Sequence, residues 1–362
     1  MSSSVTAIVQ QYVGPLVNSN GTPSSSQAPG GIAAVYLGGE SYYVPFGYIN
    51  SAGDAPTPDT VFGLGSVTKT LTTSILGQST NLFNAAVDDY LPPGFTLLTS
   101  EQAVTFEELA TFTGGIPEQN PPQETQAAFQ AFIANVAPPV LPAPNVYSDC
   151  SIGLLGQVLM YNCPAEYKWI DAATNAADAT TWYQDFLLTA LGMTSTTATP
   201  PGTSLATPYQ YDSTTGAYET ANYEPWCPWG TAGRMYSSAS DMVDFIMANV
   251  GITIINGNSV PQDILDGMAQ ALMPRASMQP PKNDVQQAFA WQVFLPTGSQ
   301  EGNICGKLGG VVGVSSYVAV NPTLQYGAVI LLNMWMPGVV QPVAIQMMQA
   351  LQPIATAMRG PK

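Results

Sequence analysis

Histidine is absent from the 362-residue sequence. This absence excludes a Ser-His-Asp or Cys-His catalytic arrangement within one chain, and it excludes zinc sites that use histidine ligands. A general base must then be Lys, Tyr, Asp or Glu. Because arginine stays protonated in proteins, the only amine bases that the chain offers are its lysines.

Charged residues are also scarce, at 9%, and the net charge is −16. Nucleic acids and anionic membranes bind clustered Lys and Arg, so neither is an expected partner. No apolar run approaches the length of a transmembrane segment, and the N-terminus lacks the basic and apolar regions of a signal peptide. The acidic, Lys-poor, Ser/Thr/Pro-rich composition nevertheless favours a secreted or periplasmic mature chain.

Cysteine is limited to four positions without CxxC spacing, namely Cys150, Cys163, Cys227 and Cys305. The spacing argues against a metal cluster, and we expect neither a metal nor another cofactor. Disulfides in an oxidising compartment and buried thiols both remain open, because the sequence does not assign pairs.

Hydrophobic patterns divide the chain into strand-rich ends and a mostly helical middle. Helical spacing predicts helices near 4–17, from Ser66 onward, at 239–250 and at 342–358. Strand patterns lie at 31–50, with a Gly-Gly turn at 38–39, and at 288–296, 315–322 and 325–335. We therefore predict an α/β (α+β) fold in which residues 1–75 and 225–362 form one domain and residues 76–224 form an inserted, mostly helical domain. The active site is expected in the cleft between them.

A possible nucleophile and base lie in the segment SVTK at 66–69, which opens a predicted helix. Residues i and i+3 share one face of a helix, so the Lys69 amine can lie against the Ser66 hydroxyl. Apolar surroundings would favour neutral Lys69, which could then act as a base. An exposed Ser–Lys pair is the alternative interpretation of this motif.

Two further segments carry candidate groups. The segment YSD at 147–149 precedes an apolar helix that Ser148, Asp149 or Ser151 can cap, and Tyr147 would project from the capping turn. The segment KLGG at 307–310 lies in a predicted strand, where glycines allow a substrate to approach Lys307 closely. An edge-strand lysine that faces water is the alternative for Lys307.

Together the three segments resemble the SxxK, Tyr-x-Asn and KTG motifs of the serine β-lactamase and penicillin-binding-protein superfamily. The resemblance covers nearly the whole chain and is closest to class C β-lactamases and the carboxylesterases that share their fold. It includes the stretches FGLGSVTKTLT, VTFEELATFTGGIPEQNP, YSDCSIGLLG and GKLGGVVGVSSYVAV. It implies a β-lactamase/transpeptidase-like fold, with an antiparallel sheet flanked by helices and built from both termini.

The resemblance also implies roles for individual residues. Ser66 would be the acylated nucleophile, and Lys69 and Tyr147 would pass its proton to the leaving group. Lys307 would supply positive potential that favours a tyrosinate. The backbone N–H groups of Ser66 and Gly310 would form the oxyanion hole, and Tyr147 would activate the water for deacylation.

Three departures from the family pattern bear on the substrate. Asp149 stands where the family usually has Asn, and an ionised Asp could pair with Lys69 and favour its ammonium. Leu308 replaces the threonine of KTG, and Gln341 replaces an arginine of class C enzymes. Both replaced groups help to hold the β-lactam carboxylate, so their loss favours neutral acyl esters.

The sequence thus predicts a carboxylesterase-type serine hydrolase that acts through an acyl-enzyme on a small-molecule ester or amide. A true β-lactamase and a catalytically silent ligand-binding protein are the alternatives. The predicted substrate-binding residues are Gln119, Asp149, Leu308, Gly309 and Trp335.

Overall fold

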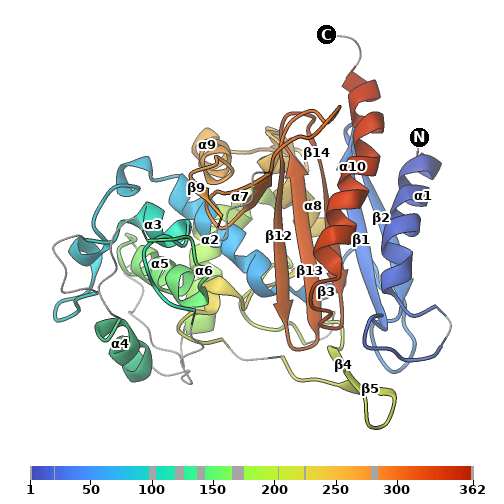
Figure 1. Ribbon diagram of the computed structural model, residues 1–362, viewed down its shortest axis with the longest axis horizontal. Helices are drawn as coiled ribbons and strands as arrows, with labels where there is room; N and C mark the ends of the chain where they lie inside the picture. Colours follow the sequence, from blue (N-terminus) through green and yellow to red (C-terminus); the bar gives the residue numbers. More distant parts are fainter. Residues whose placement is uncertain are drawn as a thin grey trace.

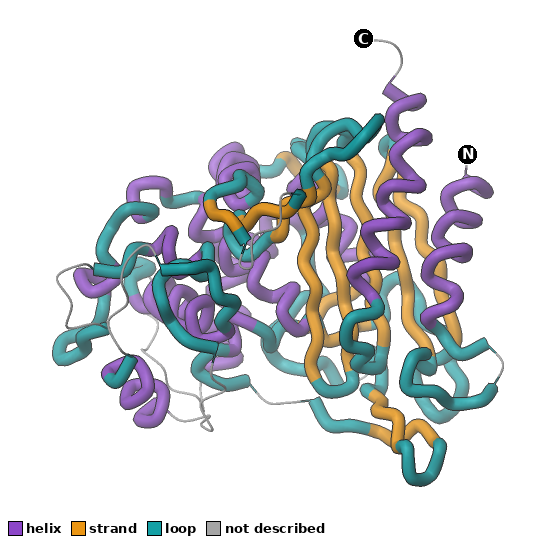
Figure 2. Tube along the Cα trace, in the orientation of Figure 1, coloured by secondary structure: helices purple, strands orange, loops and turns teal. Residues whose placement is uncertain are grey.

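The computed structural model describes residues 2–19, 21–97, 103–118, 126–136, 143–164, 175–202, 204–223, 226–278 and 284–359. An eight-stranded antiparallel sheet forms its largest layer (Figures 1 and 2), with the strand order β2-β1-β14-β13-β12-β11-β10-β9. The strands are β1 (Gly30–Leu37), β2 (Glu40–Gly47), β9 (Ala276–Ser277), β10 (Val285–Gln287), β11 (Gln292–Phe294), β12 (Ile304–Val311), β13 (Val314–Asn321) and β14 (Tyr326–Leu332).

The two ends of the chain meet in this sheet, because β1 pairs with β14 in a register that runs from Gly31–Leu332 to Tyr36–Gly327. Strands β1 and β2 form the hairpin that the Gly-Gly turn predicts, and both glycines have positive φ, 64° and 84°. Such backbone angles suit glycine, which has no Cβ to clash. The predicted sheet, flanked by helices and built from both termini, is confirmed.

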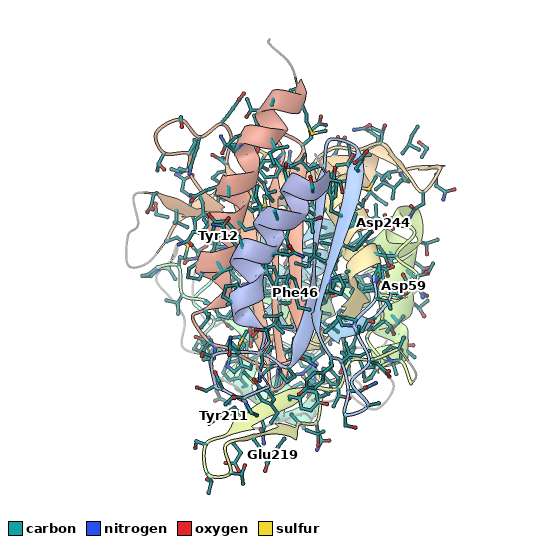
Figure 3. All side chains as sticks on the ribbon, turned by 90° about the vertical axis from the view of Figure 1, so that its right-hand side faces the viewer. Tyr12, Phe46, Asp59, Tyr211, Glu219 and Asp244 are labelled. Carbon is teal, nitrogen blue, oxygen red and sulfur yellow. The ribbon has the colours of Figure 1, made fainter. Side chains whose placement is uncertain are left out.

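Helices cover both faces of the sheet. Helices α1 (Ser2–Val13) and α10 (Val340–Arg359) lie side by side on one face (Figure 3), and α8 (Ala239–Asn249) contacts β1 and β14 from the other. Every position of β1 is consequently buried. Successive side chains alternate between faces, so Ile32 joins the core beneath α8 and Ala33 joins the core beneath α1 and α10.

The remaining elements include the helices that carry the site, α2 (Thr68–Gly77) and α5 (Asp149–Tyr161). The other helices are α3 (Phe106–Ala110), α4 (Gln126–Ala134), α6 (Asn175–Tyr183), α7 (Thr189–Leu191) and α9 (Gln262–Ala271), with a π-helical turn at Gln184–Leu188. Short 3-10 segments lie at Gly14–Leu16, Gly65–Val67, Thr80–Leu82, Val87–Tyr90 and Gly230–Ala232. The small strand pairs are β3 (Val61–Gly63) with β6 (Tyr236–Ser238), β4 (Tyr209–Asp212) with β5 (Ala217–Thr220), and β7 (Ile254–Ile255) with β8 (Asn258–Ser259).

The structure differs from the sequence prediction at several short strands. The predicted strand at 288–296 shortens to β11, because Ala290 turns the chain with a φ of 60°. The β4–β5 hairpin lies in the stretch 76–224, which was predicted to form a mostly helical domain. The predicted boundaries of the inserted domain stay a prediction, although α3, α4, α5 and α6 gather beside the sheet (Figure 1).

Candidate active site

Ser66 lies on a tight turn that joins β3 to α2, within the 3-10 segment Gly65–Val67. The preceding residue, Leu64, fixes this turn through both backbone groups. Its N–H donates to the carbonyl of Met235 at 2.8 Å, and its carbonyl accepts from Ser316 Oγ at 2.6 Å. The Ser66 hydroxyl is thereby held, partly exposed, at the N-terminal end of α2, where the helix dipole favours negative charge.

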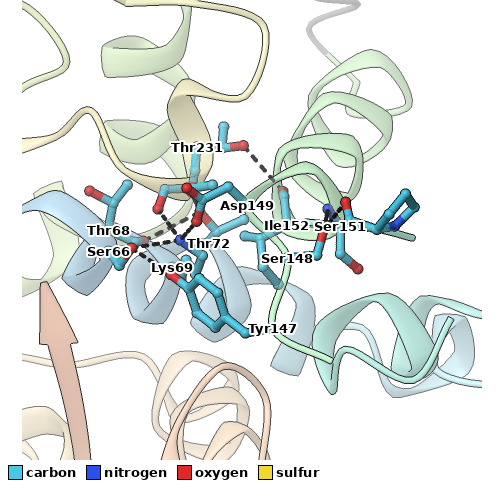
Figure 4. A network of polar contacts seen from close by, with 12 residues as sticks. Ser66, Thr68, Lys69, Thr72, Tyr147, Ser148, Asp149, Ser151, Ile152 and Thr231 are labelled. Carbon is cyan, nitrogen blue, oxygen red and sulfur yellow. Dashed lines mark hydrogen bonds and ion pairs between the residues drawn. The ribbon is translucent and has the colours of Figure 1, made fainter. Parts of the chain in front are cut away.

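Lys69 follows one turn later on α2 and is fully buried. Its Nζ lies 2.8 Å from Ser66 Oγ, 2.6 Å from Asp149 Oδ1 and 2.6 Å from the carbonyl oxygen of Ala232 (Figure 4). The three N–H groups of an ammonium match these acceptors. A neutral amine would donate through its two remaining N–H groups and accept the hydroxyl hydrogen of Ser66. Burial lowers the pKa of Lys69, and Asp149 opposes that shift.

Asp149 forms an ion pair with Lys69, as its departure from the family pattern predicts. Its side chain is 36% exposed, whereas that of Lys69 is 0% exposed. Burial alone would raise the pKa of Asp149, but the charge and hydrogen bond of Lys69 hold it below the ordinary value. The carboxylate therefore stays ionised and works against the neutral form of the amine.

Tyr147 places its hydroxyl 2.6 Å from Ser66 Oγ. The next residue, Ser148, caps α5 by accepting the N–H of Ser151 at 3.0 Å, and its hydroxyl donates to the carbonyl of Pro117 at 3.1 Å. Ser148 is one of the three caps that the sequence left open, and its hydrogen bonds fix the residues on either side of it. Burial, then the negative charge of Asp149, raise the pKa of Tyr147 well above its ordinary value. The surroundings thus favour the phenol, which differs from the tyrosinate that the resemblance implies.

Lys307 projects from β12 toward the ring of Tyr147, with its Nζ 4.4 Å from the ring centre and 5.9 Å from that of Phe112. Only 7% of Lys307 is exposed, so it is not a water-facing edge lysine. Burial and the nearby charge of Lys69 lower the pKa of Lys307 well below its ordinary value. The structure therefore brings together all four predicted catalytic side chains.

Glycines bring β12 against the turn that carries Ser66. A Cβ on Gly65 would lie 2.5 Å from the backbone nitrogen of Gly310, and a Cβ on Gly309 would lie 2.1 Å from the carbonyl oxygen of Leu64. Both distances are too short for a side chain, so this backbone contact requires glycine. Gly65 also has a positive φ of 49°. The predicted oxyanion-hole residues thus belong to two backbone segments in direct contact.

A cavity of about 180 Å³ opens beside Ser66. It is lined by Ser66, Asp149, Trp229, Ala232, Gly233, Arg234, Gly310 and Val311. Sequence reasoning did not select Arg234, because an arginine cannot serve as a base. The sequence feature that could have identified Arg234 as a site residue is the scarcity of basic residues, since it is one of only eight in the chain.

The other predicted substrate-binding residues are distributed more widely. Gln119 lies outside the described residues. Leu308 lines a separate cavity of about 460 Å³ that also includes Gln341. Trp335 is 38% exposed and covers Gly310, where a Cβ would overlap its ring.

The described part of the chain contains no cluster of Cys, Asp and Glu suited to a metal ion. Within those same residues, none of the helices is both long and apolar enough to cross a membrane. All four cysteines are buried.

Comparison with known proteins gives one consistent family. The family model described as Beta-lactamase matches residues 5–351. A beta-lactamase of Escherichia coli (strain K12) is 32% identical over 163 residues, which span 43% of this chain and 43% of that protein. A beta-lactamase of Lysobacter lactamgenus is 25% identical over 361 residues, covering 92% of this chain and 86% of that protein.

Solved structures agree at the level of the fold. A class C beta-lactamase from Rhodobacter sphaeroides superposes with a TM-score of 0.74 at 22% identity, covering 97% of this chain and 99% of the other. A second class C beta-lactamase gives a TM-score of 0.76 at 19% identity, with 97% of both chains covered.

Proposed function

The chain belongs to the beta-lactamase family of serine hydrolases, and from this premise we propose that it is a carboxylesterase-type enzyme with Ser66 as its nucleophile. The observation that carries the proposal is the contact of Ser66 Oγ with Lys69 Nζ at 2.8 Å and with Tyr147 Oη at 2.6 Å. These contacts give one hydroxyl both a proton acceptor and a proton donor.

Acylation begins when Ser66 Oγ attacks the ester carbonyl and its proton moves to neutral Lys69. The carbonyl electron pair moves onto oxygen, where the N–H groups of Ser66 and Gly310 stabilise the charge. Collapse then breaks the bond to the leaving alkoxide. Tyr147 protonates that oxygen and recovers its proton from Lys69, and Lys307 provides positive charge beside the phenol.

Deacylation reverses the same proton path. A water molecule gives its proton toward Tyr147 and Lys69 as it attacks the acyl carbonyl, and Ser66 Oγ leaves and is reprotonated. No separate glutamate is needed for this step. The buried position of Lys69 is important here because it favours the neutral amine that the cycle requires at its start.

The preference for neutral esters is supported by the neighbourhood of β12. Leu308 and Gln341 line the cavity of about 460 Å³ with Phe294 and Ile345, and none of its described lining residues is basic. Because Leu308 and Gln341 are uncharged, a β-lactam carboxylate would find no charged partner at these two positions, where each charged hydrogen bond would be worth about 1.5–3 kcal/mol. The nearby Trp335 offers apolar surface instead.

Hydrolysis of β-lactam amides is the second candidate, because the relatives and structural neighbours carry the name beta-lactamase. Turnover of a short-chain p-nitrophenyl ester and of a chromogenic cephalosporin, measured side by side, separates the two. We expect the ester to have the higher kcat/KM. Efficient cephalosporin turnover with negligible ester turnover would reverse the assignment.

Mass spectrometry tests the nucleophile itself. A fluorophosphonate should add to Ser66, and the adduct should be lost in Ser66→Ala. Absence of an adduct with this probe and with a β-lactam would instead support a silent binding protein, in which Asp149 keeps Lys69 protonated.

A further inference from the structure

We propose that Phe112 is a positioning residue for the proposed reaction, because its ring holds the phenol of Tyr147 against Ser66 and forms a second aromatic wall beside Lys307. The inference rests on the proposed function, in which Tyr147 protonates the leaving oxygen. It assigns a role to a side chain that cannot act as acid or base and that is not part of the described lining of the cavity beside Ser66.

The backbone of Phe112 has a conformation that a bulky residue seldom adopts. Its φ is 60°, and it is the only aromatic residue with a positive φ in the described part of the chain. Contact between Cβ and the backbone makes such an angle unfavourable for residues other than glycine. Strained residues of this kind gather at functional sites, where the surrounding structure keeps them in place. The position of this ring is therefore maintained against an unfavourable backbone angle.

Hydrogen bonds connect this strained residue to the segment that leads into Tyr147. The N–H of Val146 donates to the carbonyl of Phe112 at 3.0 Å, and the buried Asn145 donates through Nδ2 to the carbonyl of Thr111 at 2.6 Å. Val146 directly precedes Tyr147 in the chain. The backbone positions of Phe112 and Tyr147 are therefore coupled, and a change in the conformation of Phe112 would displace the phenol.

The rings of Phe112 and Tyr147 are also in contact. Their centres lie 5.0 Å apart at an interplanar angle of 45°, a separation typical of favourable aromatic pairs. Phe112 is buried in the core cluster against which Tyr147 packs. A tyrosine side chain has only two torsion angles that direct its ring, so a fixed backbone and a fixed neighbouring ring determine where the hydroxyl lies. That hydroxyl is 2.6 Å from Ser66 Oγ (Figure 4).

Phe112 also contributes to the surroundings of Lys307. The Lys307 Nζ lies 4.4 Å from the ring centre of Tyr147 and 5.9 Å from that of Phe112. The face of an aromatic ring attracts a cation within about 6 Å, whereas burial lowers the pKa of Lys307 and favours its neutral amine. The two rings therefore offset part of the effect of burial and favour positive charge beside the phenol that donates the proton.

Two esters of the same acid, whose leaving groups differ in their need for a proton, test the proposal. Ethoxide needs a proton as it leaves, whereas p-nitrophenolate is a stable anion near neutral pH. A misplaced Tyr147 should therefore slow acylation by ethyl butyrate more than acylation by p-nitrophenyl butyrate. The measurement is the ratio of kcat/KM for the ethyl ester to kcat/KM for the p-nitrophenyl ester.

Phe112→Leu and Phe112→Gly should each lower this ratio at least fivefold. Leucine keeps an apolar side chain but removes the ring. Glycine adopts a positive φ without strain, so the second variant retains the backbone conformation if the first does not. A loss of stability alone would lower the activity toward both esters equally and leave the ratio unchanged.

A double-mutant cycle shows whether Phe112 acts through the phenol. In the Tyr147→Phe background, replacement of Phe112 should change the ratio less than twofold, because the proton donor is already absent. Phe106→Leu is the matched control, since it removes another buried ring of the same core cluster, one that pairs with Tyr90, and it should leave the ratio unchanged. Fluorophosphonate labelling of Ser66 shows whether each variant is folded.

The failures of the two proposals are distinguishable. An unchanged ratio in labelled Phe112→Gly, or an equal decrease with and without the Tyr147 hydroxyl, would overturn only the role of Phe112. No Ser66-dependent hydrolysis of either ester would overturn the esterase assignment, and the role of Phe112 with it.

Discussion

Asp149 is the residue at which the site departs furthest from the resemblance, since its carboxylate lies 2.6 Å from the proposed base. An anion beside an amine favours the ammonium, while burial of Lys69 favours the neutral form. The activity of the enzyme at neutral pH depends on the balance between these two effects. Rates should therefore rise from acid toward mildly alkaline pH as Lys69 loses its proton.

Replacement of Asp149 by Asn should move this acid limb to lower pH. Removal of the carboxylate lowers the pKa of Lys69 further, so a larger fraction of the enzyme holds the neutral base near pH 7 and kcat/KM should rise several-fold there. The measurement is a pH profile of ester hydrolysis from pH 5 to 10. Glu107→Gln is the control, because Glu107 pairs with Arg275 rather than with Lys69. A limb displaced to higher pH would contradict the role given to Lys69.

A second acidic residue, Asp244, should limit stability rather than activity. Burial raises its pKa from 3.8 to about 6, although Asn256 Nδ2 donates to the carboxylate at 2.8 Å. The folded state then binds more protons than the unfolded state between about pH 4 and pH 6, so stability falls as the pH rises through this window.

Asp244→Asn should remove this penalty and raise the free energy of unfolding by up to about 3 kcal/mol at pH 8. The gain should be smaller at pH 5, where the native carboxyl is still mostly protonated. Urea denaturation at pH 5 and pH 8 measures the gain in free energy of unfolding. Asp89→Asn, at an exposed position, serves as the control. An equal gain at the two pH values would rule out the ionisation as its cause.

At the scale of elements, the start of α5 orients the site, because Ser148 stands between Tyr147 and Asp149. Ser148→Ala removes the cap and should cost about 1–2 kcal/mol of stability. It should also reduce kcat/KM, since both neighbours lose their fixed positions. The matched variant is Ser238→Ala, which removes the equivalent cap of α8, where the hydroxyl accepts from Asp241 N–H at 3.2 Å.

Ser238→Ala should destabilise the protein by a similar amount without the selective loss of activity. Thermal unfolding and ester kinetics on both variants separate the two effects. If both variants lost activity in proportion to stability, the cap of α5 would have no special role in catalysis.

The sequence was most informative where local geometry decides position. The contact of Ser66 with Lys69 follows from their spacing on one helix, and a cap before the apolar run was recognisable, although Ser148 was only one of three candidates for it. The sequence did not predict that Arg234 lies near Ser66, because this proximity depends on the pairing of β3 with β6, two segments far apart in the chain.

Other features that the sequence did not predict also depend on contacts between distant segments or on burial in the folded chain. Strands of two to four residues, such as β4 and β9, carry too little alternation to be recognised. The pKa of Tyr147 depends on burial and on Asp149 together, and burial is a property of the assembled core. The family resemblance implied a tyrosinate, but it could not account for the burial of Tyr147 or for the charge of Asp149 beside it.

At the scale of the whole molecule, the acidic surface should govern solubility. The net charge is −16 at pH 7 and the pI is about 4.1. Self-repulsion keeps such a chain dispersed at neutral pH and disappears near the pI. Light scattering across pH 3–8 should therefore show association centred near pH 4, and a maximum above pH 6 would contradict this account.

The pairing of β1 with β14 also sets the order of events during biosynthesis. The ribosome releases β1 before β14, and β14, the strand that pairs with one edge of β1, lies almost three hundred residues downstream. At about 5–20 residues per second, that interval is roughly 15–60 s. During this time the nascent β1–β2 hairpin exposes an apolar, unpaired strand edge, and such edges promote aggregation. A chaperone that shields the β1–β2 hairpin during synthesis should therefore improve the yield of active enzyme more than one that acts on the finished chain.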